Sequence, residues 1–106
     1  MNVKILPAAR ERVIEIWRYS CERWGAAQAG RYVQGLHSFM EQASERRLIW
    51  KPLREERFEG VFLLRYEHHY IFFRELSDGT LAVISVLHEN MDLPRRVRED
   101  LEDSES

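Results

Sequence analysis

The chain has 106 residues, 44% of them hydrophobic, and a formal net charge of -2. This length suits one domain with its own core, so we expect residues 1–106 to fold together without a disulfide or a metal. The slightly acidic balance disfavours direct binding of nucleic acid, because such binders gain most of their affinity by neutralising phosphates. No segment approaches the ~20 apolar residues that a membrane span needs, and the first residues lack a signal-peptide pattern, so we expect no membrane partner and a cytoplasmic location.

The first half of the chain predicts a short strand followed by two amphipathic helices. The strand covers Asn2–Leu6 at or near a sheet edge, and Pro7 ends it and suits a first helical turn. The first helix runs from Ala8 to Trp24 and stops at Gly25. Its apolar stripe contains Ala9, Val13, Ile16, Trp17, Cys21 and Trp24. Cys21 is the only cysteine, so we expect a core thiol in a reducing compartment.

The second helix is predicted from Ala26 to Ala43, and it pairs with the first as an antiparallel hairpin. Its apolar face contains Ala29, Tyr32, Val33, Leu36, Met40 and Ala43, with Phe39 at the edge. Gly30 and Gly35 each cost about 1 kcal/mol of helix stability relative to Ala. They suggest that another backbone approaches this helix closely.

The segment from Ser44 to Glu59 is rich in Arg and Glu, with Trp50 in its middle. We interpret it as a solvated connection across the surface. The alternative is a partner-facing patch over Arg46–Arg57, because Arg and Trp are enriched at interface centres.

Three strands joined by hairpins follow. Val61–Tyr66 and Tyr70–Leu76 are separated by a turn at Glu67–His69, and Asp78-Gly79 predicts a two-residue turn into the next strand. Thr80–His88 is apolar on both sides, with Leu81, Val83, Ser85 and Leu87 on one and Ala82, Ile84, Val86 and His88 on the other. Such a strand belongs near the centre of a sheet, covered on both faces.

The last residues predict a short helix or tail over Leu93–Leu101, within residues 93–106, and an acidic, frayed end over Glu102–Ser106. The fold class is therefore α+β with the order β-α-α-β-β-β, in which a helical hairpin packs on one face of a small antiparallel sheet. The other face then has only a short tail to cover it. We expect that partly open face to bind a partner.

The sequence contains only weak indications of a metal site or a catalytic site. His68 and His69 are adjacent, so they point to opposite sides of an extended chain, and no pair has metal-ligand spacing; we predict no metal and no cofactor. A metal-free ribonuclease needs a base, an acid and a cation near the phosphate. The available candidates are His88, Glu89, Arg65, Arg74 and His68, but no diagnostic spacing ties them together.

Several motifs together resemble the ParE branch of the RelE/ParE toxin superfamily. The segments Ile16–Tyr19, Arg23–Ala29 and Tyr32–Leu36 resemble its helical hairpin. The run His69–Arg74 is similar to its penultimate strand, and Val86–Asp92, with the sequence VLHENMD, is similar to its closing motif. The resemblance covers residues 3 to 93, and the pieces occur in order on the expected elements.

This resemblance implies the toxin component of a type II toxin–antitoxin system, with a cognate ParD-like antitoxin that binds as an extended, largely helical segment and can form a heterotetramer with the toxin. ParE-like toxins inhibit DNA gyrase and have no established catalytic residues. We accordingly predict a non-enzymatic, plasmid-stabilisation type of toxin. Its partner-contacting residues would be Trp24, Arg65, Arg74, His88, Met91 and Asp92.

Two alternatives stay open. A RelE-like ribosome-dependent mRNA endoribonuclease would use His88 or Glu89 as base and Arg65 or Arg74 to hold the phosphate. A degenerate, non-toxic module would only bind its partner.

Overall fold

The computed structural model describes residues 2–54 and 58–105. The elements are β1 (Val3–Ile5), α1 (Pro7–Trp24), α2 (Ala26–Ser44), the 3-10 turn η1 (Arg47–Ile49), β2 (Lys51–Pro52), β3 (Phe62–Tyr66), β4 (His69–Glu75), β5 (Leu81–His88) and α3 (Leu93–Glu105). The strands form one sheet in the order β1-β5-β4-β3-β2. The predicted α+β class and element order are confirmed. The structure also contains two elements beyond the predicted order, the short strand β2 and a full C-terminal helix.

The sheet is mixed rather than wholly antiparallel. β1 lies at an edge, as predicted, but it runs parallel to β5, with Val3 opposite Leu81 and Ile5 opposite Val83. The helical hairpin between the two strands makes this possible, because parallel neighbours need a long crossover. The other neighbouring strands are antiparallel.

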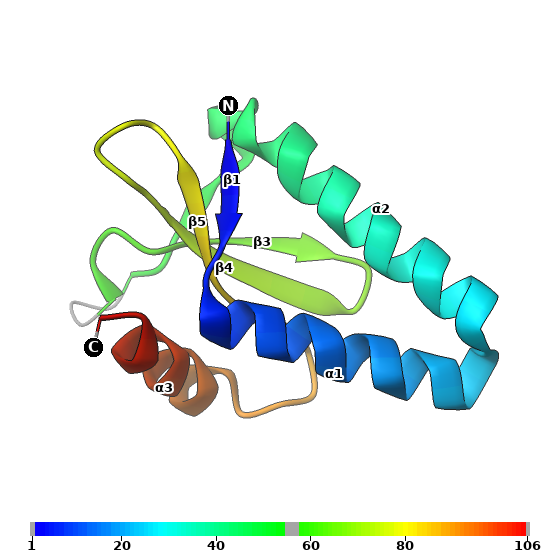
Figure 1. The fold of residues 1–106 in the computed structure, drawn as a ribbon. Helices are drawn as coiled ribbons and strands as arrows, with labels where there is room; N and C mark the ends of the chain where they lie inside the picture. The colour runs from blue at the N-terminus through cyan, green and yellow to red at the C-terminus, as the bar shows by residue number, and fades with distance from the viewer. Residues whose placement is uncertain (1, 55–57, 106) are drawn as a thin grey trace.

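Helices α1 and α2 pack on one face of the sheet and meet at a single intervening residue (Figure 1). That residue, Gly25, has φ +89°, a conformation that glycine adopts without steric cost. The buried positions of α1 are Ala9, Val13, Ile16 and Ser20, and those of α2 are Ala29, Leu36, Met40, Ala43 and Ser44. In the part of the chain that the structure describes, no helix has the length and apolar character to cross a membrane.

The predicted stripe of α1 is correct in its first half and wrong in its second. The buried line continues to Ser20 rather than to the tryptophans. Trp17 is 43% exposed and Trp24 is 54% exposed. Cys21 is half-buried rather than a core residue. Ser20 is 4% exposed, so a small polar residue rather than either indole continues the buried line.

Of the two glycines of α2, one marks a close approach. A Cβ at Gly35 would lie 2.3 Å from the Tyr66 hydroxyl oxygen, whereas a Cβ at Gly30 would have no atom of the described residues within 4 Å. The approaching group is therefore a side chain, and the predicted approach of a backbone is wrong. Tyr66 also packs on Tyr32 and Phe39, with ring centroids 5.5 and 5.3 Å away.

Trp50 belongs to the core rather than to a solvated connection. It is buried, and its Nε1–H donates to the Ala43 carbonyl over 2.8 Å. Its ring meets Phe73 edge-on at 5.0 Å and lies 5.4 Å from Phe62. The Arg and Glu residues around it obscured this role in the sequence. Residues 55–57 of the predicted connection lie outside the described residues.

β5 is covered on both faces, as predicted, but its alternation changes partway. Phe72 of β4 pairs with Ser85 and Phe73 pairs with Val83, so Ile84 is an extra residue and forms a β-bulge. The face that meets the hairpin consequently carries Leu81, Val83 and Val86, and the opposite face carries Ile84, Ser85 and Leu87. The strict alternation that we predicted is wrong after Val83.

The β4–β5 connection has three residues rather than two. The Leu76 N–H donates to the Thr80 carbonyl, and the Gly79 N–H donates to the Leu76 carbonyl. Gly79, with φ +90°, completes a three-residue loop with a bulge.

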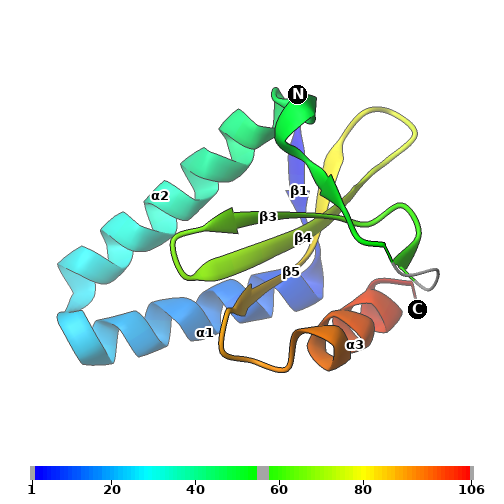
Figure 2. The same cartoon turned by 180° about the vertical axis from the view of Figure 1, so that it is seen from behind.

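The sheet face opposite the hairpin is covered over β5 by this chain's own C-terminal helix (Figure 2). α3 continues through the predicted frayed segment to Glu105. Val97 and Leu101 pack in one core cluster with Phe72, Ile84 and Leu87. The expected open face is thus reduced to the part over β3 and β4, where Leu63 and Tyr70 are half-buried beside a small pocket of about 130 Å³.

A buried polar network fixes α3. Asp100 is 6% exposed and accepts hydrogen bonds from Arg12 Nε at 3.0 Å, Arg12 Nη2 at 3.1 Å and Ser85 Oγ at 2.5 Å. The bond with Asp100 also raises the pKa of Arg12. α3 is thus tied to both α1 and β5, a role that no sequence pattern reveals.

Candidate functional site

Two joined clefts run along α1, on the side that faces the end of β5. The first, which we call the hairpin-tip cleft, has a volume of about 280 Å³ and lies under the α1–α2 junction. It is lined by Tyr19, Ser20, Trp24, Gln28, Tyr32, His68, His69 and His88. The second, which we call the α1–β5 cleft, has a volume of about 330 Å³ and is lined by Arg12, Glu15, Ile16, Tyr19, Val86, His88 and Met91. The clefts share Tyr19 and His88.

Strand register brings the histidines to this place. Tyr66 pairs with His69, and His69 pairs with His88, so the ends of β3, β4 and β5 meet at one edge. Glu67 and His68 form the turn between β3 and β4, and the Glu89 N–H donates to the His68 carbonyl at 2.9 Å. Three histidines from two hairpins therefore converge beside the tip of the helical hairpin.

The floor of the hairpin-tip cleft contains a neutral tyrosine–histidine pair. The Tyr32 hydroxyl lies 2.6 Å from His69 Nδ1. Burial raises the pKa of Tyr32 to about 12, and burial, followed by the nearby charges of His88 and His68, lowers the pKa of His69 to about 4. With the Tyr32 hydroxyl as the donor to Nδ1, the neutral ring of His69 carries its own proton on Nε2.

His88 has the same tautomer for a different reason. Its Nδ1 accepts a hydrogen bond from the Asn90 backbone N–H at 3.1 Å, so the neutral ring carries its proton on Nε2. Its ring meets His69 edge-on, with centroids 5.2 Å apart and planes at 83°.

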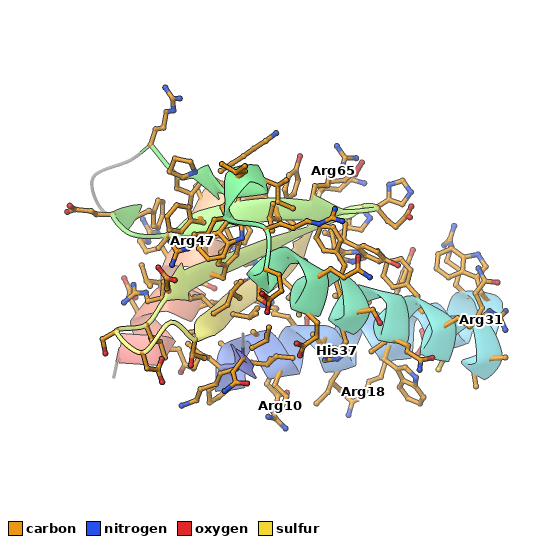
Figure 3. All side chains as sticks on the ribbon, turned by 90° about the horizontal axis from the view of Figure 1, so that it is seen from above. Arg10, Arg18, Arg31, His37, Arg47 and Arg65 are labelled. Carbon is orange, nitrogen blue, oxygen red and sulfur yellow. The ribbon has the colours of Figure 1, made fainter. Side chains whose placement is uncertain are left out.

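The rim on the strand side is an ion-paired group. Arg65 Nη2 lies 2.7 Å from Glu89 Oε2, and His68 Nδ1 lies 3.3 Å from the same oxygen. Arg65 Nε also donates to the Glu67 carbonyl, and its guanidinium lies 5.6 Å from the centre of the Tyr70 ring. Arg65 projects from the sheet edge in Figure 3. A carboxylate that is paired with an arginine and lies beside a histidine is bound internally rather than poised as a free base.

The rim on the helix side is aromatic. Tyr19 and Trp24 are both more than half exposed, and their rings meet edge-on at 6.2 Å. The Arg23 guanidinium lies 5.8 Å from the centre of each ring. Exposed aromatics next to Arg are typical of interface centres.

Of the six predicted contact residues, the structure gathers four and separates two. Trp24, His88 and Met91 line the two clefts, and Arg65 is linked through Glu89 to His68, which lines the hairpin-tip cleft. Arg74 pairs with Ala82 near the other end of β4, about 16 Å along the strand from His69.

Asp92 belongs to the start of α3. Its carbonyl accepts a hydrogen bond from the N–H of Arg96, and this bond closes the first turn of the helix. Asp92 therefore occupies the N-cap position rather than a wall of either cleft.

The arrangement contains part of what RNA cleavage would need. Arg65, His68, His88 and Glu89 lie together, but Arg74 does not join them. Within residues 2–54 and 58–105, no group of three or more His, Cys, Asp or Glu side chains is placed to hold a metal ion.

Sequence reasoning missed five lining residues of the hairpin-tip cleft: Tyr19, Ser20, Gln28, Tyr32 and His69. A usable signal existed for two of them. Gln28 and Tyr32 are four residues apart on α2, so they lie on one side of that helix. The contribution of His69 depends on the β3–β4 register, which the sequence did not specify.

Comparison with known proteins adds a family. Residues 3–93 match the family described as ParE toxin of type II toxin-antitoxin system, parDE. The toxin ParE1 of Mycobacterium tuberculosis is 34% identical over 91 residues, which cover 86% of this chain and 92% of that protein. The toxin ParE of Escherichia coli is 33% identical over 102 residues, covering 95% of this chain and 98% of that protein.

Solved structures agree on the fold. One is the RelBE2 toxin–antitoxin complex of M. tuberculosis, with a TM-score of 0.61 at 20% identity over 82% of this chain and 88% of that one. Another is a chromosomal ParDE system of P. aeruginosa, with a TM-score of 0.67 at 16% identity over 83% of this chain and 95% of that one.

Proposed function

Because this chain belongs to the ParE toxin family of type II toxin–antitoxin systems, we propose that it inhibits DNA gyrase in the cytoplasm and is neutralised by a cognate ParD-like antitoxin. The observation that carries the antitoxin part is the pair of joined clefts along α1. Three residues predicted to contact a partner, Trp24, His88 and Met91, line these clefts.

The dimensions of the clefts suit a helical segment of an antitoxin. From Arg12 to Trp24, α1 rises about 18 Å, which equals roughly three turns of a partner helix. Apolar side chains of such a helix would enter the α1–β5 cleft and the hairpin-tip cleft in turn, which is the helix-in-groove mode of recognition. This groove replaces the opposite sheet face as the proposed docking surface, because α3 covers that face over β5.

Non-catalytic inhibition of gyrase is supported by the state of the polar residues. Glu89 is held by Arg65 and His68, and Nδ1 of His69 is engaged by the Tyr32 hydroxyl. A binding function needs no free base, so this arrangement favours inhibition by contact rather than by turnover.

The antitoxin part is tested by calorimetric titration of the purified antitoxin into the wild type and two variants. Met91→Glu puts a charge into the α1–β5 cleft and should weaken binding about 30-fold or more, which corresponds to a hot-spot cost of about 2 kcal/mol. Arg18→Ala is the control, because Arg18 projects from α1 away from the sheet (Figure 3). Equal affinities of wild type and Met91→Glu would contradict this placement of the antitoxin.

Size measurement of the complex tests the stoichiometry. We propose a heterotetramer of two toxins and two antitoxins, which analytical ultracentrifugation distinguishes from a 1:1 complex.

A RelE-like endoribonuclease is the second candidate, and the gathering of Arg65, His68, His88 and Glu89 favours it. Translation-dependent cleavage of mRNA that is lost on His88→Ala would establish it. Normal growth during expression without antitoxin would instead favour a non-toxic binding module.

A further inference from the structure

The hairpin-tip cleft presents two unused hydrogen-bond donors. In the neutral rings of His69 and His88, Nδ1 accepts a bond from within the protein, so Nε2 carries the proton. The hydrogen bonds of His69 and His88 within the described residues use Nδ1, and neither Nε2 is among the fully buried polar atoms that lack a partner. Both N–H groups are therefore available to a ligand.

The walls of the cleft suit a flat, apolar group. The rings of Tyr19, Trp24 and Tyr32 surround a space of about 280 Å³, near the lower end of the range for small-ligand pockets. Aromatic rings pack against one another in edge-on and offset arrangements, and Tyr19 and Trp24 already adopt an edge-on arrangement at the mouth.

The charges around the cleft favour an anion. No Asp or Glu is among its lining residues within the described chain, and the nearby Glu89 is already held by Arg65 and His68. Arg23 stands at the mouth, over the rings of Tyr19 and Trp24. Imidazole N–H donors and a guanidinium are complementary to a carboxylate.

We infer that the hairpin-tip cleft binds an aromatic side chain with an adjacent carboxylate, supplied by an antitoxin segment in which an aromatic residue neighbours an Asp or Glu. The ring lies between Tyr19, Trp24 and Tyr32, and the carboxylate accepts from Nε2 of His69 and His88. The antitoxin as the source of this group rests on the proposed function. The preference for an aromatic acid follows from the cleft residues alone.

A small aromatic acid tests the chemistry without the antitoxin. N-acetyl-tryptophan has the ring and the carboxylate, and N-acetyl-tryptophanamide has the same ring without the charge. In NMR titrations of the full chain at neutral pH, the acid should shift the imidazole signals of His69 and His88 and the indole signal of Trp24, with a Kd of about 1 mM. The amide should bind at least about tenfold more weakly, because it gives up the charged acceptor.

Matched variants locate the site. Trp24→Ala should weaken binding of the acid about tenfold, and Trp17→Ala should not, since Trp17 is a similarly exposed tryptophan on α1 that lines neither cleft. His88→Ala should remove most of the preference for the acid over the amide while the ring still binds. His37→Gln, on α2 outside both clefts, is the control for histidine (Figure 3).

Competition identifies the occupant. Saturating antitoxin should displace N-acetyl-tryptophan, and simultaneous binding of both would overturn the antitoxin as the source and leave a site for a free aromatic acid. Absence of shifts at about 10 mM of the acid would overturn the inference, while calorimetric binding of the antitoxin would still support the proposed function. Binding of the acid without any binding of the antitoxin would refute the proposed function alone.

Discussion

Replacement of Asp100 by Ala is predicted to destabilise the fold by about 3 kcal/mol. The change removes an acceptor that serves both Arg12 and Ser85. Ser85 is fully buried, so its hydroxyl would lose its partner at a cost of about 1–2 kcal/mol. The Arg12 side chain is 15% exposed and keeps Glu15 at 3.6 Å, so losing Asp100 costs it about 1–2 kcal/mol, less than the cost of breaking a fully buried ion pair.

Urea denaturation measures this cost, and a double-mutant cycle assigns it. Ser85→Ala should cost about 1 kcal/mol in the wild type and nothing in the Asp100→Ala background, because the stranded hydroxyl is then removed. Glu102→Ala is the control on the same helix, since Glu102 is exposed, and it should change stability by less than about 0.5 kcal/mol. An effect of Asp100→Ala no larger than that of Glu102→Ala would refute the idea that this network holds α3.

The remaining predictions concern α2 and the hairpin-tip cleft. Gly30→Ala should stabilise the protein by about 1 kcal/mol, whereas Gly35→Ala should destabilise it by about 1–2 kcal/mol because its Cβ meets the Tyr66 hydroxyl. Thermal melts compare them, and a Gly35→Ala variant that gains nothing from added Tyr66→Phe would contradict this cause. For His69, the folded pKa of about 4 lies below its ordinary value of 6.5, so its stability contribution is full above pH 6.5 and falls as the pH drops toward 4. Urea titrations should show the wild type losing about 2 kcal/mol relative to His69→Gln over that range, after allowance for the solvent-exposed part of the ring. A pH-independent difference between the two would show that His69 is not held neutral.

The helical hairpin was predictable because two independent patterns agreed. The apolar spacing from Ala29 to Ala43 defines one face, and Gly25 marks the reversal. The meander was predictable from β-branched and aromatic runs separated by turn residues.

The C-terminal half of the core was not predictable from such patterns. α3 buries only a few apolar side chains and depends on Asp100, which resembles any other residue of an acidic tail until Arg12 and Ser85 are placed beside it. The charged neighbours of Trp50 predict a solvated connection, although a single indole can enter a core between polar residues. No glycine marks the bulge at Ile84 in the sequence. The extra residue is an ordinary apolar side chain that is buried on the α3 side of the sheet.

The candidate site was partly predictable for a related reason. Trp24, His88 and Met91 are predicted as partner contacts from the family resemblance, and the structure places them along the two clefts, while their role as contacts stays a prediction. Arg74 was misplaced relative to the others because sequence proximity to His69 does not reveal how far a strand carries a residue from its neighbour.

The most direct measurement is the supercoiling of relaxed plasmid by purified gyrase, with this protein added at increasing ratios and with the antitoxin present or absent. The proposed function predicts that supercoiling falls as the protein is added, and that antitoxin mixed in beforehand restores it. Unimpaired supercoiling at a large excess of folded protein would contradict gyrase as the target.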